Sequence, residues 1–270
     1  MSAGCGASHF DLGVLDRLSR GASPIHKLDP RAKLAVTLAF VVAVMSLPKY
    51  AVGDILPFFV FPFIMLARSG VLPRFILRRL VAVAPFAVMV GAFNPLFDTE
   101  IALRIGGTGI SGGWLSFASI VLRFLLTIGA LLLLMATTGV PALGRAAAQL
   151  GVPRVFVAQI LGLYRYLFLA LEEAQNTHLA WRLRTAHGRH PSWRVHAHIL
   201  GQLLLRAVAR ARRVHTAMEC RGFDGEFRLM SRPVFTARDW AFVIGWGAAF
   251  AVLRFGHPAE AIGALVLGAV

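Results

Sequence analysis

The sequence is poor in charged residues, in lysine and in cysteine, and each shortage excludes a class of protein. Only 15% of its 270 residues are Asp, Glu, Lys or Arg and 57% are hydrophobic, whereas an ordinary soluble domain has about 25% charged residues. This composition excludes a disordered chain and disfavours a soluble globule. Cys5 and Cys220 lie far apart without a Cys-x-x-Cys or zinc spacing, so neither a disulfide framework nor a cysteine metal site is indicated.

Lysine occurs only at positions 27, 33 and 49, and none of these lysines follows a glycine. The Gly-x-x-x-x-Gly-Lys-Ser/Thr loop that cradles the phosphates of ATP is therefore absent from the sequence. We expect no enzyme activity and no cofactor, and any ATP that drives this protein must be hydrolysed by another subunit. The segment 1–13 has no basic stretch and no apolar stretch, so we expect no cleavable signal peptide.

What the chain does contain is long apolar runs. A perpendicular membrane span needs about 20 residues, so the first two runs, which are shorter, are interpreted as a hairpin that turns at Pro48. We predict an all-α polytopic membrane protein with about five transmembrane helices, four to six being allowed. The runs are Leu34–Leu47, Ile55–Ala67, Val81–Phe97, Trp114–Thr138 and Trp240–Leu253, with a fragment at Ala261–Val270.

The positive charge predicts the orientation. Segments 1–33, 68–79 and 139–232 carry +2, +4 and +9, which together equal the net charge of +15. Short cytoplasmic loops hold the basic excess of membrane proteins, and these segments fall on one side if the runs alternate. We therefore expect a multi-pass protein of the cell (inner) membrane with a cytoplasmic N-terminus. The predicted domains are 1–138, a cytoplasmic insert at 139–237, and 238–270.

The insert is too long to be a loop, because it has about 90 residues and connecting loops have a median of about 4 to 6. Its pattern is helical over Ala142–Leu150, Val155–Arg184 and Ile199–Arg221. An internal repeat at an offset of 37 brings Arg184 onto Arg221. The matched pairs are Leu167/Leu204, Ala170/Ala207, Ala174/Ala211, His178/His215, Ala180/Ala217, Arg184/Arg221 and Gly188/Gly225.

Both copies of the repeat end in an arginine near a glycine. An arginine in a last turn is favourable against the helix dipole, and Gly222 is the residue expected at a left-handed cap. One interpretation is therefore a simple helix stop. The other is that Arg184 and Arg221 present their guanidinium groups at helix tips, where the planar fork can bind a carboxylate of another protein. Arg206 and Arg210 are assigned to a solvated or lipid-headgroup face.

Several other patterns carry less weight. The stretch Gly106–Gly113 fits both a Gly-x-Ser-x-Gly elbow and a dinucleotide fingerprint, but both need a strand inside an α/β unit, so we favour a flexible turn. For the nine histidines we expect structural or solvated roles and no metal site. Arg123 lies inside an apolar run, so it is either paired within the protein or in contact with a partner protein. Asn94 is a second polar residue that could contact a partner within the membrane. The basic insert lacks interleaved aromatic residues, so no nucleic acid partner is expected.

Three segments resemble the transmembrane T component of energy-coupling factor (ECF) transporters. Ser23–Leu34 looks like that family's entry segment, in which Asp29 is a good N-cap and Pro30 a good first helical residue. Ala180–Thr185 resembles its first arginine signature, with Arg182 or Arg184 as the tip and Thr185 in place of the common glycine. Ala217–Phe223, which contains Met218, Arg221 and Gly222, resembles the second. The opening 10–16 looks most like the cobalt and nickel branch, the CbiQ type.

The resemblance implies a coupling subunit without chemistry of its own. Its partners would be two cytoplasmic ABC-type ATPase subunits, which take the arginine tips, and a substrate-binding membrane subunit, all in contact with membrane lipid. Two alternatives stay open at this point. One is a T component of the vitamin branch, and the other is a membrane-embedded enzyme acting on a phosphorylated or lipid substrate.

Overall fold

The computed structural model describes residues 18–19, 21, 23–48, 52–94, 101–105, 108–185, 192–223 and 235–256. Helices make up nearly all of this part, which confirms the predicted all-α membrane class; a two-stranded hairpin is added to it. The elements are α2 (Pro30–Met45), α3 (Val52–Ile55), the 3-10 helix η1 (Leu56–Phe59), α4 (Val60–Ser69), α5 (Pro73–Gly91), β1 (Ile101–Ile105), β2 (Thr108–Ser111), α7 (Gly112–Thr138), α8 (Val140–Gln149), α9 (Arg154–Arg184), α10 (Trp193–Glu219) and α11 (Ala237–Phe255).

The chain forms two compact units. The first comprises Met1–Ala146 together with Pro233–Val270, and the second comprises Ala147–Arg232. The second unit is therefore an insertion, which the chain enters within α8 and leaves before α11. Its bounds lie inside the segment 139–237 that charge and loop length single out.

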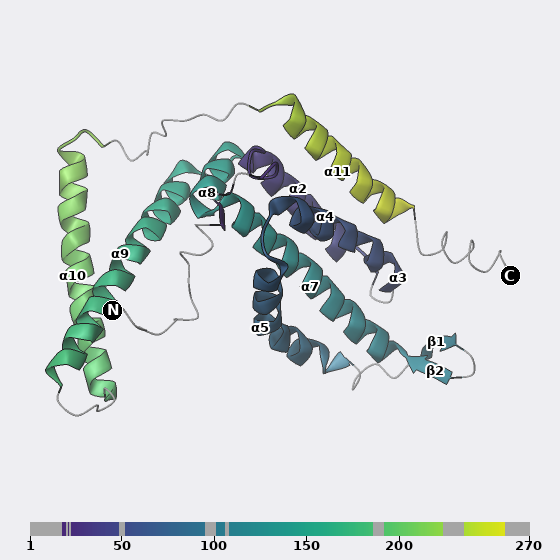
Figure 1. Cartoon of the computed structure of the whole chain (residues 1–270), viewed down its shortest axis with the longest axis horizontal. Coiled ribbons are helices and arrows are strands. Elements are labelled where there is room, and N and C mark those ends of the chain that lie inside the picture. Colours follow the sequence, from purple (N-terminus) through teal and green to yellow (C-terminus); the bar gives the residue numbers. More distant parts are fainter. Residues whose placement is uncertain are drawn as a thin grey trace. The chain divides into compact units, whose positions relative to one another are not determined.

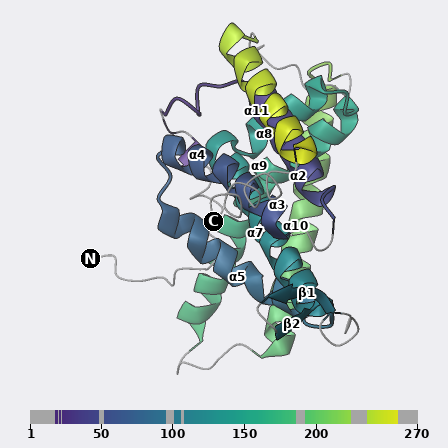
Figure 2. The same cartoon turned by 90° about the vertical axis from the view of Figure 1, so that its right-hand side faces the viewer.

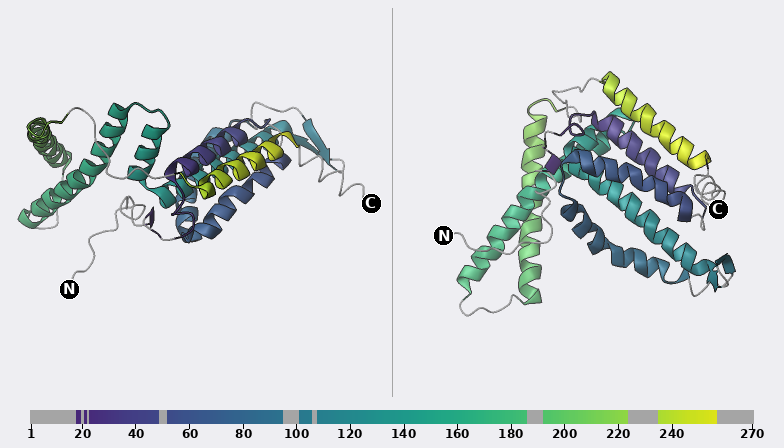
Figure 3. Two further views of the ribbon diagram at one scale, coloured as in Figure 1. Left: turned by 90° about the horizontal axis from the view of Figure 1, so that it is seen from above. Right: turned by 45° about the vertical axis from the view of Figure 1, so that its right-hand side comes forward.

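The first unit is built from α2, α4, α5, α7 and α11. As the sequence predicts, Asp29 caps α2, accepting a hydrogen bond from the Arg31 backbone N–H at 2.8 Å, and Pro30 is its first residue. α2 packs against both α7 and α11, while α5 and α4 also pack on α7. Figure 3 shows α2, α4, α7 and α11 with their axes roughly aligned.

Aromatic side chains fill the centre of this unit. The Phe40 ring of α2 lies 4.7 Å from Phe61 of α4 and 5.4 Å from Phe250 of α11, measured between centroids. Trp246 packs edge-on against Phe61 at 4.8 Å. Phe40, Phe61 and Phe250 are almost fully buried. Burial of such large apolar side chains stabilises the unit and joins α2 to α4 and α11 (Figure 1).

The other predicted runs correspond to helices with shifted ends. The run Ile55–Ala67 is divided among α3, η1 and α4, and Gly70 ends α4 with φ 70°. α5 begins at Pro73, eight residues before the run Val81–Phe97, because proline favours a first helical position and arginine is a good helix former. The fragment Ala261–Val270 lies outside the described residues.

A short antiparallel hairpin precedes α7. β1 pairs with β2 so that Ile105 lies opposite Thr108 and Arg104 opposite Gly109, and β2 leads directly into α7 at one end of that helix (Figure 2). The preference for a flexible turn at Gly106–Gly113 is therefore wrong for 108–111, where backbone pairing forms a strand. This two-stranded hairpin differs from the parallel α/β unit that a nucleophile elbow or a dinucleotide site requires.

By length and composition alone, two helices of the described part could cross a membrane, Gly112–Thr138 and Val155–Arg184. α2 and α4 are short, with 16 and 10 residues, while α5 and α11 include charged residues near their ends. The second candidate belongs to the insert that charge assigns to the cytoplasm. The number of spans therefore stays a prediction.

Candidate partner-binding site

The predicted tips lie on α9 and α10, which pack together as an antiparallel pair in the second unit (Figure 1). Side chains near the end of α9 line a groove with side chains near the start of α10, including Arg184 and His198. Those near the start of α9, such as Tyr166, line a second groove with Val214 and Met218 near the end of α10. The two helices therefore run in opposite directions.

Glu173 holds the crossing point of this pair. Its Oε2 accepts from Arg210 Nη2 at 3.1 Å, and its Oε1 from Arg206 Nη1 at 3.5 Å. The side chains of Arg206 and Arg210 are 56% and 38% exposed, so the expected solvated face is compatible with the structure, but their contact with Glu173 was not expected from the sequence. Helical periodicity identifies the face of a residue and not its partner on another helix. Sequence reasoning also missed Glu173, although the offset of 37 between Glu173 and Arg210 equals that of the repeat.

This coincidence indicates local twofold pseudosymmetry. Glu173 and Arg210 are equivalent positions of the two repeat copies, and they contact each other at the crossing. When equivalent residues of two antiparallel helices meet, the axis that exchanges the helices passes between them. Arg184 and Arg221, also equivalent, are then presented in equivalent ways on either side of that axis.

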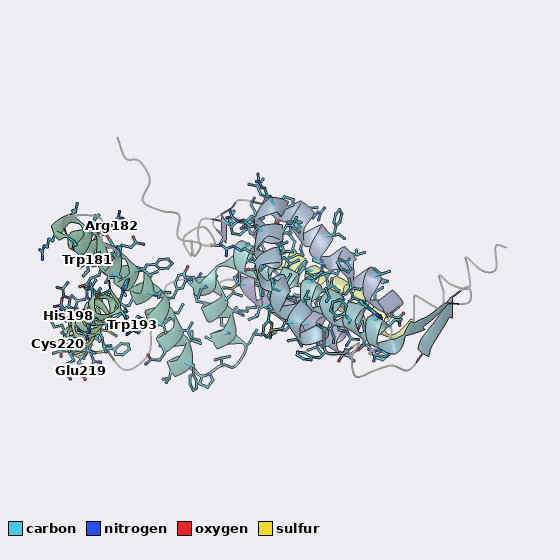
Figure 4. All side chains as sticks on the ribbon, turned by 90° about the horizontal axis from the view of Figure 1, so that it is seen from below. Trp181, Arg182, Trp193, His198, Glu219 and Cys220 are labelled. Atoms are coloured by element: carbon cyan, nitrogen blue, oxygen red, sulfur yellow. The ribbon has the colours of Figure 1, made fainter. Side chains whose placement is uncertain are left out.

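Arg184 is the last residue of α9 and is exposed. With Ala180, Trp181 and His198 it lines a groove of about 690 Å³ between the helices. Arg182, labelled with Trp181 in Figure 4, precedes it by two positions, so the two arginines point about 200° apart around the helix. α9 ends at Thr185, whose backbone is extended at φ −93° and whose hydroxyl donates to the Trp181 carbonyl at 2.9 Å.

The second tip is organised by a glycine cap. Gly222 has φ 76°, which confirms the predicted left-handed cap. The Phe223 N–H donates to the Met218 carbonyl and the Gly222 N–H to the Glu219 carbonyl, at 3.0 and 2.9 Å. α10 ends at Glu219, so exposed Arg221 lies in the cap and not in the final turn. The glycine cap directs the chain sharply away and leaves the guanidinium group accessible.

The two tips lie at opposite ends of the helical pair. Arg184 faces the groove beside His198, and α10 continues from there toward Arg221. At a rise of 1.5 Å per residue, that stretch of helix is about 35 Å long. Two separate partner surfaces, or two copies of one surface, are needed to bind both arginines at once.

The intramembrane polar candidates contact the protein itself. Arg123 Nη2 donates to the Pro48 and Leu47 carbonyls at 2.6 and 3.1 Å, beyond the end of α2. Asn94 Nδ2 donates to Ser116 Oγ at 2.7 Å, which joins the end of α5 to α7. Within the described ranges no three His, Cys, Asp or Glu side chains form a group that could hold a metal ion.

Comparison with known proteins identifies a family. A family model described as Cobalt transport protein, CbiQ, matches residues 21–232. Cobalt transport protein CbiQ of Rhodobacter capsulatus is 31% identical over 155 residues, covering 56% of this chain and 64% of that protein, so the match spans slightly less than two thirds of the relative. Cobalt transport protein CbiQ of Salmonella typhimurium is 27% identical over 229 residues, covering 80% of this chain and 99% of that protein.

Proposed function

Because the chain belongs to the CbiQ cobalt transport family, we propose that it is the transmembrane coupling subunit of an ATP-driven ECF-type importer for cobalt. It lies in the cell (inner) membrane with its N-terminus and second unit in the cytoplasm. Two ABC-type ATPase subunits bind the second unit, and a separate membrane subunit binds the cobalt. The chain transmits the movement of the ATPases to that subunit.

The observation that supports this proposal is the pair of exposed arginines at opposite ends of one pseudosymmetric helical pair. A guanidinium group at a helix end forms a strong bidentate pair with a carboxylate. Two equivalent arginines about 35 Å apart along a helix suit two ATPase subunits that are themselves related by a twofold axis. A change in the separation of the ATPases then exerts force on both ends of the pair.

The test is cobalt uptake by variants of the tips. Truncation of one partner of a buried charge pair at an interface weakens the free energy of binding by about 2 to 5 kcal/mol. We expect Arg184→Ala and Arg221→Ala each to reduce Co²⁺ uptake by more than tenfold while the protein still reaches the membrane, and the double variant to lose the ATPases on purification. Lysine at either position should restore uptake only partly, because it lacks the planar fork.

Arg212→Ala and Arg213→Ala are matched controls, since both side chains are exposed on α10 and each change removes one positive charge. Both should retain uptake. Arg206 and Arg210 are unsuitable because they contact Glu173. Normal uptake and normal ATPase co-purification in both tip variants would show that the arginines only end their helices, and would refute the proposed coupling role.

A membrane-embedded enzyme is the rival from another class. The coupling role requires the purified chain to hydrolyse no ATP, since it has no P-loop, and hydrolysis to appear when ATPase partners are added. ATP turnover by a preparation free of other proteins, checked by mass spectrometry, would favour the enzyme. Uptake of a vitamin instead of Co²⁺ by the reconstituted complex would assign it to the vitamin branch.

A further inference from the structure

Two helix ends of the first unit flank the inserted second unit along the chain. The first is the end of α7 at Thr138, which is followed by Gly139 with φ 72° and then by α8, within which the chain leaves the first unit after Ala146. The second is the start of α11, whose N-cap is Thr236 and whose capping box is completed by Asp239. We call these two helix ends the roots of the inserted unit.

Buried polar residues join these roots to the start of α2. Lys33, Asp29 and Asp239 are 1%, 5% and 3% exposed. Lys33 Nζ donates to the Thr137 carbonyl at 3.1 Å, which holds the root at the end of α7. Asp239 Oδ1 accepts from the Asp29 N–H and its Oδ2 from the Thr236 N–H, both at 2.8 Å, which holds the root before α11. We call Asp29, Lys33, Thr137 and Asp239 the root cluster.

A cluster of buried charged residues is an energetically unfavourable way to join three helix ends, if joining them is its only role. Burial of charged groups carries a desolvation cost that apolar residues of similar size would avoid. Asp29 Oδ2 and Thr138 Oγ1 are moreover buried without a hydrogen-bond partner, and such groups are uncommon in folded proteins. The cluster nevertheless specifies which helix ends meet, because Lys33 binds the root at the end of α7 and Asp239 links the root at α11 to the start of α2.

We propose that the root cluster is the joint through which movement of the second unit reaches the membrane helices, with Lys33 and Asp239 as positioning residues. This inference rests on the proposed coupling function. The chain connects the inserted unit to the rest of the protein only through α8 after the first root and through the segment before the second root, so the two roots lie on its covalent path. The cluster fixes both roots to α2, so they move α2 and α11 together rather than separately.

The experiment uses the full transporter in liposomes, with Co²⁺ uptake and ATP hydrolysis measured in the same preparation. Lys33→Met keeps the length of the side chain and loses the bond to the Thr137 carbonyl. We expect hydrolysis to stay within about twofold of the parent and the ATP consumed per Co²⁺ to rise about tenfold, the size expected for loss of a buried charged hydrogen bond. Lys33→Arg, which keeps a charged donor, should restore the ratio partly.

Asp29→Asn is a milder second variant, because asparagine still caps α2 while the buried charge is removed. The ATP consumed per Co²⁺ should also rise in this variant. Lys27→Met, at an exposed lysine, is the control and should leave the ratio unchanged. An unchanged ratio in folded Lys33→Met and Asp29→Asn would refute the joint. Equal loss of uptake and hydrolysis in both would assign the cluster a purely structural role and refute it too. Normal uptake by the Arg184 and Arg221 variants would instead refute the proposed function on which the joint depends.

Discussion

Arg123 shows how an arginine is accommodated inside an apolar helix. Its guanidinium donates to the carbonyls of Leu47 and Pro48, and Arg254 of α11 donates to the Ser46 carbonyl at 3.0 Å. These carbonyls belong to the C-cap Ser46 and to the two residues after it, so they lie just beyond the last turn of α2. Two arginines from two other helices thus bind the backbone of the segment that leaves α2. Of the two interpretations of Arg123, these contacts favour structural pairing.

This pairing predicts a stability effect for Arg123→Leu. Hydrogen bonds to charged groups contribute about 1.5 to 3 kcal/mol each, so the melting temperature in detergent should fall clearly while the ATPases still co-purify. Arg68→Leu, at an exposed arginine in the last turn of α4, is the control and should melt as the parent does. An unchanged melting temperature combined with loss of the substrate-binding subunit would instead show a partner contact.

At the scale of elements, the crossing of α9 and α10 depends on few interactions. Among the described residues of the second unit, Val157 is the only buried large hydrophobic side chain. The ion pairs of Glu173 with Arg206 and Arg210 join the two helices without a buried apolar core between them. Such a pair can change its crossing angle without disrupting a packed core, as a transmitting element requires.

A double-mutant cycle measures the strength of this contact. Glu173→Gln and Arg210→Met should show a coupling free energy of about 0.5 to 1 kcal/mol, because the ion pair is partly exposed and solvent screens it. The quantity to measure is the free energy of unfolding in mild detergent. The same cycle with Arg213→Met in place of Arg210→Met should give no coupling. A coupling near zero for Arg210 would contradict its role at the crossing.

The sequence was sufficient for features set by local chemistry. The Asp29–Pro30 start of α2 and the Gly222 cap of α10 follow from the backbone preferences of single residues, and both are confirmed. Features that depend on a distant partner could not be read in this way. The contact of Glu173 with Arg210 and that of Lys33 with Thr137 join positions on different helices, and no periodicity along one helix identifies such a partner.

At the scale of the whole molecule, α9 separates two topologies. Charge predicts that the chain crosses the membrane four times before the insert, which leaves the insert inside, yet α9 is long and apolar enough to cross by itself. A reporter fused after Asp98 should indicate the outside and one fused after His190 the inside. A fusion after His190 that reports outside would place α9 across the membrane and refute the cytoplasmic insert.

The cap of α10 makes the two equivalent helix ends differ in the substitutions that they tolerate. Position 222 corresponds to position 185 at the offset of 37; the first is glycine at φ 76° and the second is threonine in an extended conformation. A Cβ at Gly222 would meet nothing within 4 Å, so only the left-handed backbone, costing about 1–2 kcal/mol for other residues, restricts this site. The extended backbone at Thr185 suits many residues, whereas the left-handed backbone at Gly222 disfavours every residue but glycine. Substitution at position 222 should therefore destabilise the cap of α10 by about 1–2 kcal/mol, while substitution at position 185 should have a smaller effect.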